Sequence, residues 1–188
     1  MKIVYDHQIF CSQSYGGISR YFYELARRLS TVENNDVKII SPLYVNKYIH
    51  HCAHINIKGI YIPKIKNSVL LLRKLNSCLS RPILMSARPD ILHETYYASK
   101  NMTALPCKRV LTVYDMIHEK FEHMFHAFDL TGKRKKRSIA HADHIICISE
   151  TTRIDLIDLY QINPEKVSTI YLGNSLTEIH PENQQPLV

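Results

Sequence analysis

Residues 2–29 read KIVYDHQIFCSQSYGGISRYFYELARRL, and this stretch sets the fold class. Its first four residues form a β-rich apolar run that ends at Asp6. The glycine pair Gly16-Gly17 then opens a segment in which apolar residues recur at helical spacing, namely Ile18, Tyr21, Phe22, Leu25 and Leu29. The order of strand, glycine loop and helix indicates the start of an α/β domain.

The glycine pair has two interpretations. Glycine permits a positive φ and lets backbone N–H groups at a helix N-terminus approach an anion such as phosphate. A tight turn before a helix uses the same residues, and geometry alone favours neither interpretation. The pair does not belong to a G-x-G-x-x-G fingerprint, and Ser41-Pro42 rather than an acidic residue follows the next expected strand. A dinucleotide-dependent oxidoreductase is therefore disfavoured.

Strands and helices alternate along the rest of the chain. Further strands are expected at residues 37–40, where Pro42 ends the ladder, and at 59–62, 91–93, 109–114, 145–148 and 166–171. Helices are expected at residues 67–80, 135–142 and 151–160, the last capped by Ser149 with Glu150 in its first turn. This alternation predicts an α/β fold with a doubly wound, mostly parallel Rossmann-like sheet and helices on both faces.

The carboxyl ends of the expected strands carry polar or small residues. Ligands of open parallel sheets bind at this edge. The candidates there are Asp6, Gly16, Gly17, His93, Asp115 and Ser149. Two of them keep an alternative: His93 is either a ligand contact or a satisfied interior histidine, and Asp115 either acts on a ligand or caps the following turn.

Length and composition predict one domain at residues 1–174, followed by a polar linker or tail at 175–188. No apolar run reaches the roughly 18 to 20 residues of a membrane-spanning helix, and the N-terminus does not resemble a secretory signal, so a cytosolic location is expected. The five cysteines form an odd set without Cys-x-x-Cys spacing, which argues against disulfides and zinc. His50, His51 and His54 beside Cys52 are interpreted as incidental surface residues, and no metal site is expected.

Positive charge gathers in two regions of this chain of net charge +7. The expected helix at residues 67–80 carries a cationic face that includes Arg73 and Lys74, and a second block consists of Lys133, Arg134, Lys135, Lys136 and Arg137. Such patches favour an anionic partner. For the helix alone, docking on anionic phospholipid and a merely solvated face are equally compatible with the pattern. A basic nucleic-acid-binding or nucleotide-binding module is the competing class, but the sequence contains no recognised motif for it.

Four runs along the chain together resemble the N-terminal domain of glycosyltransferase family 4. They are residues 15–22, 110–117, 142–150 and 171–173. The resemblance implies the N-terminal half of a GT-B architecture, in which two Rossmann-like domains face a cleft and no metal or cofactor is required. It implies a retaining transfer of a hexose or N-acetylhexosamine from a nucleotide diphosphate sugar to a saccharide on a polyprenyl diphosphate, as in surface polysaccharide synthesis of the O-antigen or capsule type.

The resemblance also implies a set of roles. Gly16, Gly17 and Arg20 would face the donor phosphates, and His93, Glu94, Ser149 and Glu150 would bind the acceptor. Family members often carry a histidine directly before the aspartate at residue 115, where this chain has Tyr114. A tyrosine is not a base near neutral pH, so Asp115 is the expected catalytic residue, with Tyr114 beside it and His118 as a helper.

The same resemblance implies a donor-binding domain that lies outside this sequence. Nothing after Gly173 supplies the nucleotide-sugar pocket, so the isolated chain is expected to lack turnover. The basic residues would dock the protein peripherally on the inner, cytoplasmic face of the membrane beside its lipid-linked acceptor.

Overall fold

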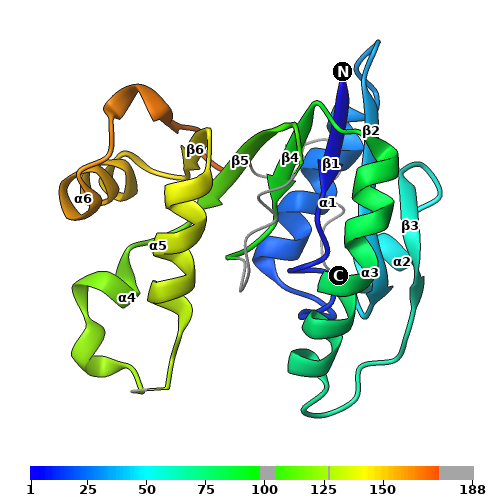
Figure 1. The fold of residues 1–188 in the computed structure, drawn as a ribbon, viewed down its shortest axis with the longest axis horizontal. Helices are drawn as coiled ribbons and strands as arrows, with labels where there is room; N and C mark the ends of the chain where they lie inside the picture. Colours follow the sequence, from blue (N-terminus) through cyan, green and yellow to red (C-terminus); the bar gives the residue numbers. More distant parts are fainter. Residues whose placement is uncertain (98–104, 127, 174–188) are drawn as a thin grey trace, which may run out of the picture.

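The computed structural model describes residues 1–97, 105–126 and 128–173. Their strands form a seven-stranded, fully parallel sheet in the order β3-β2-β1-β4-β5-β6-β7 (Figure 1). The strands are β1 (Lys2–Tyr5), β2 (Asp36–Tyr44), β3 (Asn56–Tyr61), β4 (Ile91–Glu94), β5 (Lys108–Val113), β6 (His144–Cys147) and β7 (Val167–Thr169). The predicted doubly wound Rossmann-like fold is confirmed. The predicted tail at 175–188 lies outside the described residues.

The helices follow the strands with one long crossover. They are α1 (Gly17–Leu29), α2 (Lys47–His50), α3 (Val69–Ala87), α4 (Ile117–Lys120), α5 (Thr131–His141) and α6 (Glu150–Tyr160), with short 3-10 turns at Glu122–Met124 and Pro164–Lys166. Helix α3 returns the chain from the edge strand β3 to β4, on the other side of β1. The strand order therefore reverses between β1 and β4, which makes this the topological switch point of the sheet.

Helices cover both faces because successive strand residues point to opposite sides. On one face, Phe22 of α1 packs in a core with Ile3 and Tyr5 of β1. On the other face, Leu84 of α3 packs with Val4, the β1 residue between them.

Helices α5 and α6 share the face of α3. Leu92 of β4 belongs to the α3 core, and the strand register places it beside Arg109 of β5. Leu111, two residues further along β5, therefore points the same way, and it packs with Ile139 of α5 and Leu156 of α6.

Strand β2 does not end at Ser41-Pro42 as predicted but continues to Tyr44. The register between β2 and β3 shifts between Ile40 and Leu43, and a proline is tolerated at such a bulge because no ladder hydrogen bond is needed there. Asn76 of α3 supplies the missing partners, since its Oδ1 accepts from Leu43 N at 2.8 Å and its Nδ2 donates to Leu43 O at 2.9 Å. Helix α3 thus stabilises the irregular part of β2.

Helix α3 is also longer than predicted. It continues through Pro82 to Ala87 and ends at Arg88, which has the left-handed conformation with φ 45°. The missing proline N–H leaves the Cys78 carbonyl without its helical donor, and both Cys78 and Pro82 lie on the exposed face of the helix.

We predict that Gly59→Ala destabilises the domain. The bulge brings the Ser41 carbonyl oxygen so close that a Cβ at residue 59 would sit 1.8 Å from it, and backbone cannot swing aside as a side chain does. The free energy of unfolding, measured by urea denaturation, should fall by more than about 2 kcal/mol. Gly17→Ala is the matched control because its Cβ would meet no atom within 4 Å. Equal stability of the two variants would contradict the close approach.

Candidate functional site at the carboxyl edge of the sheet

A buried carboxylate joins β1 to β4 at the switch point. Asp6 follows β1, and its carboxylate accepts hydrogen bonds from Thr95 N at 2.9 Å, from the Thr95 hydroxyl, and from Gln8 Nε2 at 2.7 Å. The same Gln8 amide donates to the Tyr96 carbonyl at 2.7 Å. Because its carboxylate accepts all of these hydrogen bonds inside the protein, Asp6 has a structural role: it holds together the starts of the loops that follow β1 and β4.

The glycine loop reaches helix α1 without the positive φ that the sequence suggested. Gly16 has φ 170°, an extended conformation open to any residue, and no glycine among the described residues has a positive φ. A Cβ on Gly16 would instead meet the side chain of Gln13, with its Oε1 only 2.2 Å away. The glycine makes room for that neighbouring amide.

The N-terminus of α1 keeps the property that suits an anion. The first four N–H groups of a helix have no partner within the helix, and in this part of the described chain no side chain caps them. No acidic residue lies in the first turn. The helix dipole adds partial positive charge at the same place. Arg20 lies near the start of the same helix and is exposed.

Asn46 holds the glycine loop in place, and sequence reasoning missed it. Its Nδ2 donates to the Gln13 carbonyl at 2.8 Å, while its Oδ1 caps α2 by accepting from Tyr48 N at 3.1 Å. Lys47 N also donates to Ser14 O at 2.9 Å. An asparagine directly before a short helix is a typical N-cap, and that pattern is the signal that was available.

The segment after β5 presents Asp115 at the sheet edge. Its Oδ1 accepts from Ile117 N at 3.1 Å, which is the turn-capping contact that the sequence left open. The side chain is nevertheless 44% exposed, so a ligand can reach it. Tyr114 lies beside it with its ring edge-to-face against Tyr21 and its hydroxyl enclosed. Burial raises the pKa of Tyr114 well above its ordinary value, so this phenol stays protonated.

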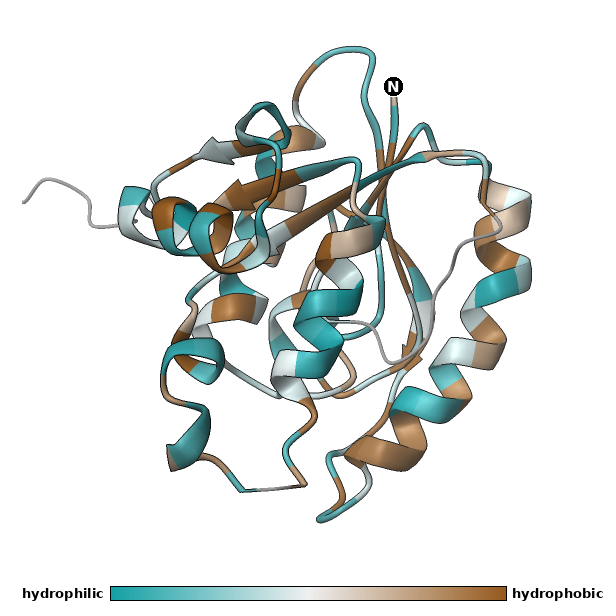
Figure 2. Ribbon diagram, turned by 60° about the vertical axis from the view of Figure 1, so that its left-hand side comes forward, coloured by the Kyte–Doolittle hydropathy of each residue, from teal (hydrophilic) through white to brown (hydrophobic). Residues whose placement is uncertain are grey.

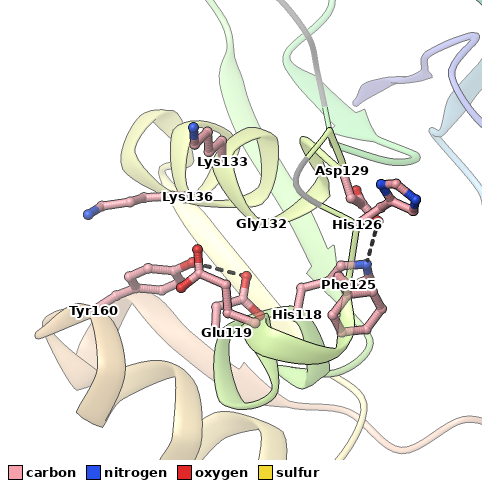
Figure 3. A pocket seen from close by; sticks show the side chains of 10 residues that line it. His118, Glu119, Phe125, His126, Asp129, Gly132, Lys133, Lys136 and Tyr160 are labelled. Carbon is pink, nitrogen blue, oxygen red and sulfur yellow. Dashed lines mark hydrogen bonds and ion pairs between the residues drawn. The ribbon is translucent and has the colours of Figure 1, made fainter.

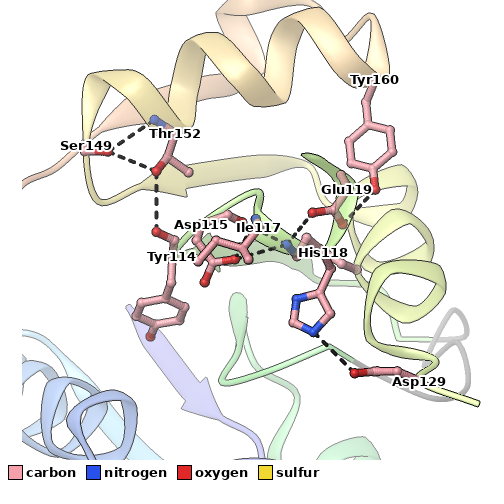
Figure 4. Close-up of polar contacts among 10 residues, drawn as sticks. Tyr114, Asp115, Ile117, His118, Glu119, Asp129, Ser149, Thr152 and Tyr160 are labelled. Atoms are coloured by element: carbon pink, nitrogen blue, oxygen red, sulfur yellow. Dashed lines mark hydrogen bonds and ion pairs between the residues drawn. The ribbon is translucent and has the colours of Figure 1, made fainter. Parts of the chain in front are cut away.

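His118 points away from Asp115. Its Nε2 lies 3.4 Å from Asp129 Oδ2 (Figure 4). Its ring stacks on Phe125 at 4.1 Å between centroids. The predicted pairing of Asp115 with a helper histidine is therefore not what the structure brings together.

Lys135 fixes the Asp115 segment from below, although it was predicted to face a membrane. Its ammonium donates to the Asp115 carbonyl at 2.8 Å and to Glu119 Oε2 at 2.7 Å, and it lies 5.4 Å from the centre of the Tyr97 ring. The side chain is only 1% exposed. The membrane prediction for Lys135 is wrong because α5 turns residue 135 to the same face as Ile139, four residues on.

Between α4 and α5 lies a pocket of about 340 Å³ (Figure 3). Carboxylates, histidines, two lysines and two aromatic rings line it together: His118, Glu119, Glu122, Phe125, His126, Asp129, Gly132, Lys133, Lys136 and Tyr160. On one wall of the pocket, the Tyr160 hydroxyl donates a hydrogen bond to Glu119 Oε1 at 3.0 Å. Over the described ranges, no three His, Cys, Asp or Glu side chains gather as a metal ion would require.

His93 and Glu94 lie inside the molecule, so the acceptor-binding role predicted for them does not fit. His93 is packed against Tyr5 and Phe22, and its Nε2 lies 2.9 Å from the Thr112 hydroxyl. Burial lowers the pKa of His93 to about 3. It is the satisfied interior histidine of the two sequence alternatives.

Glu94 forms a buried ion pair with Arg109 of β5. Burial raises the pKa of Glu94 to about 7, and the Arg109 charge opposes that rise. This pair connects β4 and β5 and keeps the Glu94 carboxylate away from any ligand at the edge.

Ser149 and Glu150 make local contacts at the end of β6. The Ser149 hydroxyl accepts from Thr152 N at 3.1 Å, so the predicted helix cap is confirmed. Glu150 pairs with Arg153 at 2.9 Å and accepts from the Thr169 hydroxyl at 2.6 Å. Both side chains keep some exposure at this edge of the sheet.

The predicted cationic surface divides into inward and outward residues. Lys74, Lys133, Lys136 and Arg137 are exposed, and Arg134 is half-buried. Arg73 turns inward, where its Nε donates to the Ser12 hydroxyl at 3.0 Å and its guanidinium lies over the Tyr96 ring. Its assignment to a membrane surface is wrong for that reason.

The strand order and the uncapped first helix define a Rossmann-like α/β domain of the kind found in GT-B glycosyltransferases. The lipopolysaccharide outer core galactosyltransferase WaaB in its apo form has the same fold, with a TM-score of 0.63 and 15% identity over 99% of this chain and 50% of that one. A glycosyltransferase from Rickettsia africae ESF-5 has a TM-score of 0.55 and 19% identity, over 98% of this chain and 46% of that one. Arabidopsis thaliana UGT89C1 complexed with UDP has a TM-score of 0.53 and 10% identity, over 97% of this chain and 55% of that one.

Residues 15–177 match the family model of Glycosyltransferase Family 4, and the chain belongs to that family. No curated protein matches the sequence. The chain spans about half the length of the solved structures that share its fold. None of the helices in the described ranges is long and apolar enough to cross a bilayer.

We predict that His93 makes stability sensitive to acid. Its folded pKa of about 3 lies below the unfolded value near 6.5. The stabilisation that the neutral His93 side chain contributes to folding is therefore complete above pH 6.5 and is lost as the pH falls toward 3. Within this window the free energy of unfolding should drop by about 1.4 kcal/mol per pH unit through this residue. His93→Gln keeps a polar partner for Thr112 but does not titrate. Parallel denaturation curves of wild type and variant between pH 7 and pH 4 would contradict the assignment.

Proposed function

We propose that this chain is the acceptor-binding half of a retaining, metal-independent glycosyltransferase. The complete enzyme would move a hexose or N-acetylhexosamine from a nucleotide diphosphate sugar to a saccharide on a polyprenyl diphosphate. The observation that carries the proposal is the half-exposed Asp115 carboxylate, held at the ligand edge of the sheet in a chain of family 4. Its backbone is fixed by Lys135 while its side chain stays accessible.

The assigned role of Asp115 is electrostatic. Glycosyl transfer passes through a state in which positive charge develops on the sugar ring, and a fixed carboxylate stabilises that charge. Lys135 Nζ lies 3.6 Å from Asp115 Oδ1, so a buried positive charge lies beside the carboxylate and helps to hold it in place. His118 belongs in this proposal to the wall behind Asp115, where it contacts Asp129 rather than the reacting atoms.

The donor phosphates would meet the N-terminus of α1. Three features support this: the uncapped N–H groups, the absence of acidic residues in the first turn, and the exposed Arg20. Gly17 leaves open space at the start of the helix, where a Cβ would meet no atom within 4 Å, whereas the Gln13 side chain lies beside Gly16. The nucleotide itself would be held by a second domain, and one protein of the same fold is known in complex with UDP.

We predict that Asp115→Asn in the whole enzyme lowers turnover by about a hundredfold or more, because the amide keeps the size of the side chain but removes its charge. Release of nucleoside diphosphate from a panel of nucleotide sugars, with a lipid-diphosphate acceptor, measures this. Asp158→Asn is the control, since Asp158 is an exposed aspartate on α6. Equal turnover in the two variants would remove Asp115 from the mechanism.

The outer face of α3 would dock the enzyme peripherally on the cytoplasmic face of the membrane. Leu71, Leu75 and Leu79 recur at intervals of four residues and are 60%, 42% and 45% exposed. Lys74 is exposed beside them, and no acidic residue occurs between Asp36 and Asp90. Figure 2 shows hydrophobic residues on successive turns of this helix. Apolar insertion with flanking cations favours an anionic bilayer. Lys133, Lys136 and Arg137 add exposed charge on α5.

We predict that Leu71→Gln combined with Leu75→Gln reduces binding to anionic vesicles about tenfold, because two apolar side chains no longer leave water. Sedimentation with phosphatidylglycerol-containing vesicles measures the bound fraction. The double variant Ile154→Gln and Leu159→Gln is the control, as these residues of α6 have similar exposure. An equal loss in both double variants would contradict docking through α3.

A further inference from the structure

Arg73 reaches the switch point of the sheet from α3. Its Nε donates to the Ser12 hydroxyl at 3.0 Å, in the loop that follows β1. Its guanidinium carbon lies 5.7 Å from the centre of the Tyr96 ring, in the segment that follows β4. The guanidinium is therefore held between the two strands where the chain order reverses, which is the place where open α/β sheets bind ligands.

The charge of Arg73 has no carboxylate partner within the described ranges. The ion pairs found there involve other residues. Asp6, whose charge acts with that of Arg73 on the neighbouring His7, accepts hydrogen bonds from Thr95 and Gln8 and forms no ion pair with Arg73 among the described residues. A half-buried cation without a counter-ion is costly, and an anionic ligand would offset that cost. A guanidinium fixed through Nε presents its two terminal nitrogens as a fork that fits a phosphoryl group.

Tyr96 connects this position to Asp115. Its ring packs against both the α1 core and the core beneath α5. Burial raises the pKa of Tyr96, and the charges that act on it are those of Arg73, Asp115, Asp129 and Arg134. The charges of Arg73 and Asp115 thus act on the same aromatic side chain, and the half-buried Arg134 contributes a second cation.

We propose that Arg73, with Ser12 and Tyr96, forms a subsite for the diphosphate of the lipid-linked acceptor, an assignment that rests on the function proposed above. The orientation of α3 favours the acceptor over the donor. Arg73 points inward while Leu71 and Leu75, on the same two turns, point outward. A diphosphate attached to a lipid lies at the surface of the bilayer, directly where these turns would meet it. The function proposed above assigns the donor phosphates to a different place, the N-terminus of α1.

Binding of geranyl diphosphate, UDP and inorganic diphosphate to the 188-residue chain tests this subsite by isothermal titration calorimetry. Geranyl diphosphate should bind the wild-type chain, and Arg73→Gln should weaken that binding by about tenfold or more. Arg81→Gln removes the same charge from an exposed position of the same helix and should leave the affinity unchanged. Circular dichroism establishes that both variants are folded, and Arg73→Lys, which keeps charge but loses the fork, should bind with intermediate affinity.

Three results would overturn the subsite. These are no binding of geranyl diphosphate to the wild-type chain, an equal loss in Arg73→Gln and Arg81→Gln, or a loss confined to UDP, which would assign Arg73 to the donor. In the whole enzyme, Arg73→Gln should raise the KM for the acceptor and leave the KM for the nucleotide sugar in place. Asp115→Asn should lower kcat without weakening geranyl diphosphate binding, so a failure of the transfer site and a failure of the subsite give different results.

Discussion

The buried carboxylate of Asp6 is the interaction on which the ligand edge of this molecule depends. Strands β1 and β4 pair directly at the switch point and helix α3 packs on both, but the two loops that follow these strands need a connection of their own. Asp6 provides it by accepting hydrogen bonds from Thr95 and Gln8. Because Gln8 also donates to the Tyr96 carbonyl, the same network sets the position of the ring beneath Arg73. Loops of both halves of the sheet therefore start from one rigid point.

A second buried charge organises the segment after β5 in a similar way. Lys135 holds the Asp115 backbone and Glu119 from inside the domain, and Tyr160 donates to Glu119 from α6. The carboxylate of Asp115 stays 44% exposed although its Oδ1 accepts from Ile117 N and lies 3.6 Å from Lys135 Nζ. Two of the cations that were predicted to face a membrane, Arg73 and Lys135, instead form hydrogen bonds at the ligand edge of the sheet. Lys74, Lys133 and Lys136 remain at the surface. The role of each cation therefore depends on how far its side chain is buried, and the number of cations in a segment does not predict it.

The proposals for this family 4 chain converge on one arrangement. The uncapped N-terminus of α1, the Asp115 carboxylate and the Arg73 guanidinium all lie at the carboxyl edge of the sheet, and the exposed leucines of α3 continue outward from Arg73. A donor phosphate, a reacting sugar and a lipid-linked acceptor would each meet a different part of this edge. The chain spans about half the length of the solved structures that share its fold. In the enzyme that we propose, a second domain would hold the nucleotide.

The sequence by itself determined the order of the strands and of the helices α1, α3, α5 and α6, the parallel winding and the cap at Ser149, because these depend on local periodicity and on hydrogen bonds between near neighbours. Only the tertiary structure decided that β2 passes Pro42, since Asn76 of a distant helix supplies the partners that the bulge lacks. It likewise placed His93 against Thr112 and turned Arg73 and Lys135 inward. These choices depend on groups far apart in the chain, and a pattern of residue types along one segment carries no information about which distant group will satisfy a polar side chain.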